Sequence, residues 1–371
     1  MDGLTFIWLI AGFILLIAGA ELLVRGASRL ALAAGISPLV IGLTVVAYGT
    51  SAPELAVSVH SSFQGAGDIA LGNVVGSNIA NILLILGISA IISPLVVAQQ
   101  LVRLDVPLMI GLSLLLLLLG LDGRLSRLDG LILFAGAISY TVFVIRQSRR
   151  ENQAIQDIYG QEFGRDQDRT GWQGWLIQMG LVIAGLVLLV IGARWLVDGA
   201  VEIASFLGIS ELIIGLTIVA VGTSLPEIAT SVVASLRGER DIAVGNVIGS
   251  NIFNILTVLG ISGLVAPAGL RVAASALHFD IPVMIAAALA CLPIFFTGNL
   301  IARWEGLLFL GYYGAYLLYL VLAVTRSPEL STLNAVMLLF VVPLTLVTLF
   351  VSVLRALRRP RRSLATDEAT R

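Results

Sequence analysis

The sequence predicts an all-α polytopic membrane protein with two inverted five-helix repeats, which form a ten-helix core, plus one extra C-terminal transmembrane helix. Composition supports this first, because 58% of the residues are hydrophobic, only 12% are charged, and the mean hydropathy is +1.01. Such values exclude a water-soluble globular protein. Apolar stretches of about 18 to 25 residues also recur, each long enough to cross a bilayer as a helix. Finally, one long segment of the chain occurs twice.

Eleven segments are predicted to span the membrane. They are 4–24, 38–62, 70–92, 104–120, 128–146, 175–196, 211–235, 243–264, 279–297, 304–323 and 333–354. The first is expected to be a retained helix, because it lacks the basic region that precedes the apolar part of a signal peptide. The polar segment 147–174 divides the chain. The predicted parts are therefore a first repeat at 1–146, a cytoplasmic linker at 147–174, a second repeat at 175–324, and the extra helix with a basic tail at 325–371.

The arginines predict an orientation. If the N-terminus lies outside, most of them face the cytoplasm, including the cluster around Arg149 and the tail from Arg355 onward. Only about five fall outside, namely Arg124, Arg127, Arg194, Arg271 and Arg326. Cytoplasmic loops of membrane proteins carry the excess of basic residues. The bias therefore favours an external N-terminus and a cytoplasmic C-terminus.

A 46-residue segment that starts at Gly42 matches one that starts at Gly215, without a gap, at a constant offset of 173 residues. The copies agree at about 30 of the 46 positions. Because each unit holds five spans, the second copy starts on the opposite side of the membrane, so the repeats are predicted to be inverted. Inverted repeats are typical of secondary transporters with a site at the midplane. A duplicated structural protein is the alternative, but the identity peaks on polar residues.

The sequences GTSAPE and GTSLPE interrupt the second and the seventh predicted span. Proline lacks the amide hydrogen, so carbonyl groups near Gly49 and Gly222 lose their helical partners. Within a bilayer, irregular backbone is tolerated only where it is buried or lines a cavity. Glu54 and Glu227 directly follow the prolines, and free carbonyls beside carboxylates predict a cation site. The alternative is that two protonated glutamates only form hydrogen bonds between helices. That interpretation leaves the prolines unexplained.

Further oxygen ligands recur around both glutamates. The groups are Ser51, Glu54 and Ser58; Ser224, Glu227 and Ser231; Asn73, Ser77 and Asn81; and Asn246, Ser250 and Asn254. Residues three or four apart share one face of a helix. Oxygen ligands without nearby Cys or His suit hard ions such as calcium, magnesium or sodium. Asn and Ser stripes alone are often only hydrogen bonds between helices, but here they accompany carboxylates.

GTSAPE with GNVVGSNIAN, and GTSLPE with GNVIGSNIFN, resemble the two alpha repeats of the cation/calcium antiporter superfamily. Over residues 1 to 324 the chain is similar to its prokaryotic sodium/calcium exchangers. The resemblance implies a calcium ion bound between Glu54 and Glu227, helped by backbone oxygens of Thr50 and Thr223. It implies that Ala47, Ser51 and Ser77, with Ala220, Ser224 and Ser250, serve flanking sodium sites, and that Asn81 and Asn254 line the middle. It also implies the inner membrane of a prokaryote.

The chain departs from this family pattern at two places. Some relatives carry Asp at the position of Asn254, whereas this chain has Asn in both repeats, so one charge is missing and the coupling ion stays open. The extra helix at 333–354 lies beyond the ten-helix pattern.

These features predict a secondary active cation antiporter that exchanges sodium for calcium by alternating access. Proton-coupled antiport of calcium or another divalent cation is the nearest alternative, and a passive channel or a scaffold is less favoured. An enzyme is not expected, because an intramembrane hydrolase using Ser51 or Ser224 would need an adjacent His or Lys base. The expected partners are calcium and sodium ions, or protons, and the lipid bilayer, with no cofactor and no nucleic acid.

Overall fold

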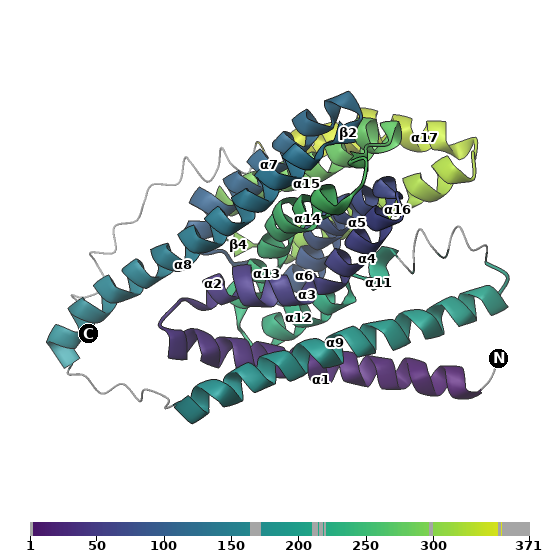
Figure 1. Cartoon of the computed structure of the whole chain (residues 1–371). Helices are drawn as coiled ribbons and strands as arrows, with labels where there is room; N and C mark the ends of the chain where they lie inside the picture. Colours follow the sequence, from purple (N-terminus) through teal and green to yellow (C-terminus); the bar gives the residue numbers. More distant parts are fainter. Residues whose placement is uncertain are drawn as a thin grey trace.

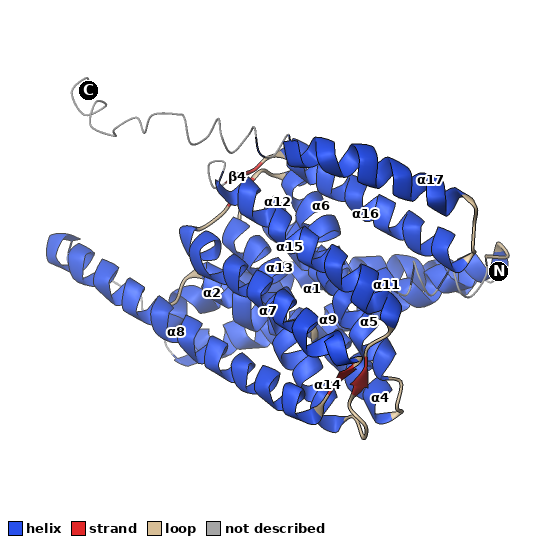
Figure 2. Cartoon of the chain, turned by 90° about the horizontal axis from the view of Figure 1, so that it is seen from above, coloured by secondary structure: helices blue, strands red, loops and turns tan. Residues whose placement is uncertain are grey.

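The computed structural model describes residues 3–163, 172–209, 220–296 and 300–347, together with residues 214, 218 and 350. This part of the chain is almost entirely helical (Figure 1), as the sequence predicts. The helices α1 and α9 lie side by side along one side of the molecule, and the other helices form the rest of the body (Figure 1). Seen from above, α16 and α17 lie along one edge (Figure 2).

The elements fall into two comparable series. The first series comprises α1 (Gly3–Ala34), α2 (Pro38–Ile41), η1 (Gly42–Val46), α3 (Ala47–Thr50), α4 (Ala52–Phe63), α5 (Gly67–Ala80), η2 (Asn81–Leu86), α6 (Gly87–Ile92), β1 (Leu95–Val96), η3 (Leu101–Asp105), α7 (Val106–Leu119), η4 (Gly120–Asp122), β2 (Arg124–Leu125) and α8 (Arg127–Phe163). The second comprises α9 (Trp172–Phe206), α11 (Ala220–Gly222), α12 (Leu225–Leu236), α13 (Arg240–Phe253), η6 (Asn254–Val258), α14 (Leu259–Val265), β3 (Leu270–Arg271), η7 (Ala276–Asp280), α15 (Ile281–Phe296), β4 (Leu300–Ile301) and α16 (Arg303–Val324). Beyond them lie α17 (Glu329–Val336) and η8 (Met337–Val341).

Eight described helices are long and apolar enough to cross a membrane, or nine if the bent pair Pro38–Thr50 and Ala52–Phe63 counts as one span. The two remaining predicted spans, 211–235 and 279–297, coincide with the shorter apolar helices Leu225–Leu236 and Ala276–Leu292. Both spans include residues outside the described part. The polytopic helical fold is therefore confirmed, and the count of eleven stays a prediction.

The predicted helix break lies at the GTSAPE sequence. The helical segments on its two sides are bent by 47°, and Ser51 between them has non-helical dihedral angles of φ −83° and ψ 11°. Ser224 occupies the matching position of the second copy, with φ −86° and ψ 4°, directly before α12. Because Pro53 and Pro226 stand in the first turn of the following helix, where no amide hydrogen is needed, each proline starts a new helix instead of continuing the old one.

Two short strand pairs join the copies to each other. Strand β1 pairs with β4, and β2 pairs with β3, both antiparallel. Exchanging the two copies converts one strand pair into the other, because β1 corresponds in position to β3 and β2 corresponds to β4. These two-residue strands are absent from the sequence-based prediction, since they are too short to leave a pattern.

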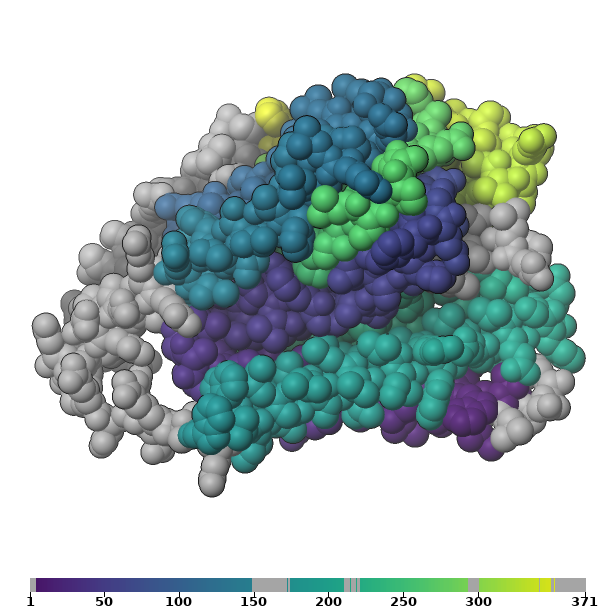
Figure 3. All heavy atoms as spheres, in the orientation of Figure 1, coloured from purple at the N-terminus to yellow at the C-terminus, as the bar shows by residue number. Residues whose placement is uncertain are grey.

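Close packing of α1 against α9 depends on glycine. A Cβ atom built on Gly185 would lie 2.6 Å from the amide nitrogen of Leu23 and 2.7 Å from the carbonyl oxygen of Gly19. Gly192 meets Leu16 and Gly12 in the same way. Small residues let helix backbones approach closely in membranes. Helix α9 lies across the face of the molecule turned toward the viewer in Figure 3.

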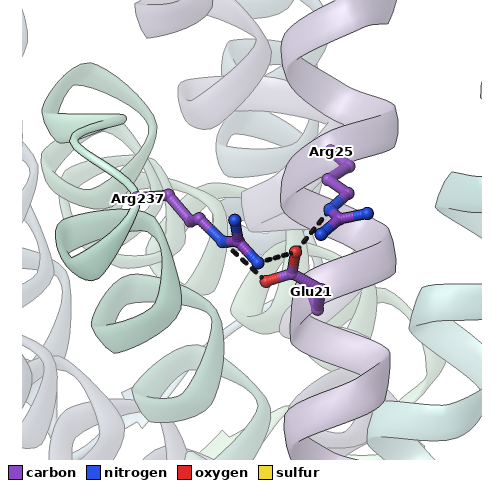
Figure 4. Close-up of polar contacts among 3 residues, drawn as sticks. All are labelled: Glu21, Arg25 and Arg237. Carbon is purple, nitrogen blue, oxygen red and sulfur yellow. Dashed lines mark hydrogen bonds and ion pairs between the residues drawn. The ribbon is translucent and has the colours of Figure 1, made fainter.

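A charged cluster ties α1 to the turn after α12. Figure 4 shows the Glu21 carboxylate between the guanidinium groups of Arg25 and Arg237, and it forms ion pairs with both. One further turn along α1, the Ser28 hydroxyl donates to Glu239 Oε1 at 2.8 Å. At the equivalent positions of α9, Arg194 and Asp198 form an ion pair with each other at 3.9 Å, and the described residues show no ion pair from them to another helix.

Two segments differ from the sequence-based boundaries. Helix α8 continues to Phe163, so the first part of the predicted linker 147–174 is helical. The extra helix α17 packs beside α16, and none of its residues is buried. Beyond η8, Thr345 Oγ1 accepts a hydrogen bond from the Tyr312 hydroxyl of α16 at 2.7 Å. The predicted basic tail from Arg355 onward lies outside the described residues.

We predict that Gly185→Ala lowers the melting temperature of the detergent-solubilised protein by several degrees, because overpacking costs about 1–3 kcal/mol. Gly180 is the matched control on the same helix, since a Cβ atom there meets nothing within 4 Å. Gly180→Ala should leave the melting temperature unchanged or slightly raised. Equal effects of the two substitutions would contradict the proposed helix contact.

Candidate functional site

The two predicted glutamates lie in the first turn of α4 and of α12, directly after the helix breaks. Glu54 is 0% exposed and Glu227 is 1% exposed. The serine at each helix break contacts the glutamate of the other copy. The structure therefore brings together the acidic side chains that the sequence analysis placed in one site.

Hydroxyl groups cross between the repeats to reach the glutamates. Ser51 Oγ donates to Glu227 Oε1 at 2.7 Å, and Ser224 Oγ donates to Glu54 Oε1 at 3.5 Å. Ser77 Oγ lies 3.5 Å from Glu54 Oε1 and also 3.5 Å from Ser224 Oγ. Each carboxylate is thus contacted by the serine at the other helix break, and both copies contribute to a single site.

Several oxygen atoms at this site have no hydrogen-bond partner within the described part of the chain. They are Glu54 Oε2, Glu227 Oε2, Asn81 Oδ1, Asn254 Oδ1 and Ser250 Oγ. The ion pairs found among the described residues involve Glu21 and Asp198, so no arginine neutralises either site glutamate. Buried polar atoms normally have partners. A group of unpartnered oxygen atoms, two of them from carboxylates, is therefore a set of ligands suited to a positive ion.

Asn73 and Asn246 support the glutamates instead of leaving an oxygen free. Asn73 Nδ2 donates to the backbone oxygen of Glu54 at 3.2 Å and to Ser58 Oγ at 3.0 Å. Asn246 Nδ2 makes the corresponding contacts with Glu227 and Ser231, at 3.4 and 3.0 Å. These bonds connect the first turn of each new helix to the neighbouring span and fix its position there.

The remaining predicted residues lie at the same two breaks. Ala47 is fully buried, and its carbonyl oxygen accepts the backbone amide of Ser51 at 3.0 Å. Thr50 Oγ1 donates to Asn246 Oδ1 at 3.1 Å. In the second copy, Ala220 begins α11, and Thr223 lies between α11 and α12. No group of three or more His, Cys, Asp or Glu side chains that could hold a metal occurs in the described ranges.

The sequence analysis missed two residues beside the site. Asn78 and Asn251 are buried, and each contacts the predicted ligand asparagine of the other repeat. They stand one position after Ser77 and Ser250, so they lie off the helix face that carries the polar stripe. Their signal in the sequence was identity between the copies, within the shared GSN tripeptide.

The chain is similar to known exchangers over most of its length. A sequence profile of the family described as "Sodium/calcium exchanger protein" matches residues 4–146 and 177–322. The sodium/calcium exchanger MaX1 of Methanosarcina acetivorans is 37% identical over 310 residues, which cover 75% of this chain and 87% of that protein. The putative antiporter CaxA of Alkalimonas amylolytica is 42% identical over 251 residues, which cover 67% of this chain and 76% of that protein.

A solved structure of the sodium-calcium exchanger NCX_Mj superposes with a TM-score of 0.71 at 34% identity, covering 84% of this chain and 97% of that one. The inner membrane protein YrbG of Escherichia coli is 40% identical over 230 residues, which cover 60% of this chain and 68% of that protein. Helix α17 lies beyond the residues that match the family profile.

We predict that Glu54→Gln combined with Glu227→Gln raises the melting temperature of the purified protein in ion-free detergent buffer. Removing two buried charges that lack a countercharge relieves their desolvation cost. Thermal unfolding with a calcium chelator measures the effect, and Glu329→Gln, at an exposed position, is the control that should change nothing. A lower melting temperature for the double variant would show that the carboxylates serve as structural hydrogen-bonding groups.

Proposed function

The chain belongs to the sodium/calcium exchanger protein family, and from that membership we propose that it exchanges sodium for calcium at the site between Glu54 and Glu227. It is a multi-pass membrane transporter and not an enzyme. The hydrolase alternative is therefore wrong.

The observation that carries the proposal is the set of unpartnered oxygen atoms around two buried carboxylates. Calcium takes six to eight oxygen ligands from carboxylates, carbonyls and amides. The free atoms Glu54 Oε2, Glu227 Oε2, Asn81 Oδ1 and Asn254 Oδ1 are of those types and come equally from both repeats. One calcium ion would balance the charge of both carboxylates.

Charge balance also gives the coupling mechanism. A charged side chain at the bilayer centre costs about 2.5–3.5 kcal/mol on insertion scales. An empty site with two charged glutamates is therefore unfavourable in the occluded state, through which the site must pass when it changes sides. Calcium or sodium ions remove this penalty, so the protein changes sides only when loaded and the two fluxes become coupled.

The neutral groups complete the proposed coordination. Backbone oxygens of Thr50 and Thr223 would assist calcium. Sodium would occupy flanking positions, with ligands from Ala47, Ser51 and Ser77 in the first repeat and from Ala220, Ser224 and Ser250 in the second. Because Ser51 Oγ and Ser224 Oγ already contact the glutamate of the opposite repeat, sodium and calcium would compete for the same oxygen atoms.

Alternating access would come from movement of α1 and α9 against the other helices. Their mutual contact is made of closely packed glycines, which favours motion of the pair as one unit. We further propose that the protein lies in the inner membrane of a prokaryote, with the N-terminus outside and the C-terminus in the cytoplasm.

Proton-coupled antiport remains the second candidate, and one observation favours it. The site contains two carboxylates and two amides, since position 254 is Asn, so charge can be balanced by two protons as well as by one divalent cation.

Replacing either glutamate should abolish exchange, because a single remaining carboxylate cannot balance a divalent cation. We expect Glu54→Gln and Glu227→Gln to reduce sodium-dependent uptake of labelled calcium into reconstituted vesicles to background, with normal amounts of folded protein. Glu329→Gln, beyond the family-matched residues, should transport normally. Near-normal uptake by either site variant would refute the proposed site.

The coupling ion can be identified from the driving gradient. Vesicles loaded with sodium should take up calcium when diluted into sodium-free buffer at equal pH on both sides. Vesicles with only an acidic interior should not. Uptake driven by the pH gradient and indifferent to sodium would favour the proton-coupled candidate.

A further inference from the structure

Four buried asparagines form a crossed network between the two repeats, beside the proposed ion site. Asn81 Nδ2 donates to Asn251 Oδ1 at 3.0 Å, and Asn254 Nδ2 donates to Asn78 Oδ1 at 3.0 Å. Each ligand asparagine thus has its amide nitrogen bound by an asparagine of the other copy. Its own Oδ1 atom has no hydrogen-bond partner among the residues that the structure describes.

Two methionines set the direction of this network. Asn251 Nδ2 lies 3.3 Å from Met109 Sδ, and Asn78 Nδ2 lies 3.6 Å from Met284 Sδ. A thioether sulfur carries no hydrogen and can only accept a hydrogen bond. Asn78 Nδ2 has a second acceptor, the backbone oxygen of Asn251 at 3.3 Å. The nitrogen of each of these two amides must therefore face its acceptor. The oxygen of the same amide must then face the ligand asparagine of the opposite repeat.

This direction matters because the oxygen and the nitrogen of an amide group are similar in size, so the group also fits when the two atoms exchange places. If Asn251 turned over, its nitrogen would donate to Asn81 Oδ1, and Asn81 would then present its own nitrogen to the site. Such an inverted network contains the same number of asparagine–asparagine hydrogen bonds. The sulfur is the group that distinguishes the two arrangements, because in the inverted one the Asn251 oxygen would face the sulfur and neither atom could donate a hydrogen bond.

We propose that Asn78 and Asn251, oriented by Met284 and Met109, are positioning residues that make Asn81 and Asn254 present oxygen to the carried cation. An inverted amide would direct N–H groups at a positive ion and repel it. The helix geometry supports this role, because the π-helical segments η2 and η6 begin at Asn81 and Asn254. Such π-bulges frequently occur at functional sites. The inference rests on the proposed function, since it assumes that the site holds a cation.

Matched substitutions at Met109 and Met284, each 1% exposed, separate orientation from packing. Met109→Leu keeps the apolar volume but removes the sulfur acceptor of the Asn251 nitrogen. Met284→Leu makes the same change at the other sulfur, but there the Asn78 nitrogen keeps the backbone oxygen of Asn251 as an acceptor. Isothermal titration of the purified full-length protein with calcium gives the affinity. With the two amide directions equally populated, half of the molecules are competent, so Met109→Leu should weaken calcium binding about twofold or more. Met284→Leu should weaken it less.

A direct substitution of the positioning residue should have a larger effect. Asn251→Leu removes the acceptor that holds Asn81, and loss of such outer contacts typically weakens metal binding about 10–100-fold. Met337→Leu, in η8 outside the site, controls for methionine replacement in general and should leave the affinity unchanged.

Equal weakening by Met109→Leu and Met284→Leu, or a larger effect of Met284→Leu, would mean that the methionines act by packing and would overturn the inference. Equal affinities for all variants would overturn it as well.

Calcium exchange in vesicles tests the proposed function separately. If the affinities follow the expected order but no exchange occurs, the proposed function fails and the inference stands. If the wild-type protein exchanges calcium but the affinities do not follow this order, only the inference fails. Absence of calcium binding by the wild-type protein would overturn both.

Discussion

The arrangement of this protein depends on two carboxylates buried in an apolar helical body without an opposing positive charge. Glu54 and Glu227 contact serines of the opposite repeat, yet each keeps one oxygen atom without a partner, and no arginine reaches them in the described part of the chain. Charges that are removed from water without compensation are strongly unfavourable. Oxygen atoms that a cation can bind lie around the two glutamates, and they make it possible for the carboxylates to be buried.

The helix breaks and the internal repeat both help to place the two carboxylates in the buried site. The breaks at Ser51 and Ser224 place a glutamate in the first turn of a new helix, and Asn73 and Asn246 bind the backbone oxygen of that glutamate. Because the same arrangement occurs in each copy, the site has two equivalent halves. The external connections are less symmetric, since Glu21 ties α1 to Arg237 while, among the described residues, the ion pair of the equivalent positions in α9 lies within that helix. The two copies therefore share a site but differ at their ends.

Much of the site could be predicted from the sequence because its signals are local. A proline beside a glutamate within an apolar helix predicts a break wherever the chain folds, and the repeated serines and asparagines predict the helix face. The contacts of Asn78 and Asn251 could not be predicted, because they join residues about 170 positions apart and depend on the rotation of packed helices. Hydropathy also failed to predict the continuation of α8 to Phe163, since a polar helix outside the membrane leaves no apolar signal. The two shorter apolar helices show the same limit, because composition measures apolar length and not the bends within it.

The central claim is that a positive ion lies between the two repeat glutamates. Crystals grown with strontium, a heavier divalent cation with the same preference for oxygen ligands, would test it by anomalous scattering. The account predicts one strong anomalous peak in coordinating contact with Glu54 Oε2 and Glu227 Oε2, with Asn81 Oδ1 and Asn254 Oδ1 nearby. A fully loaded crystal with no peak there, or with its only peak at another carboxylate such as Asp105 or Asp280, would contradict it.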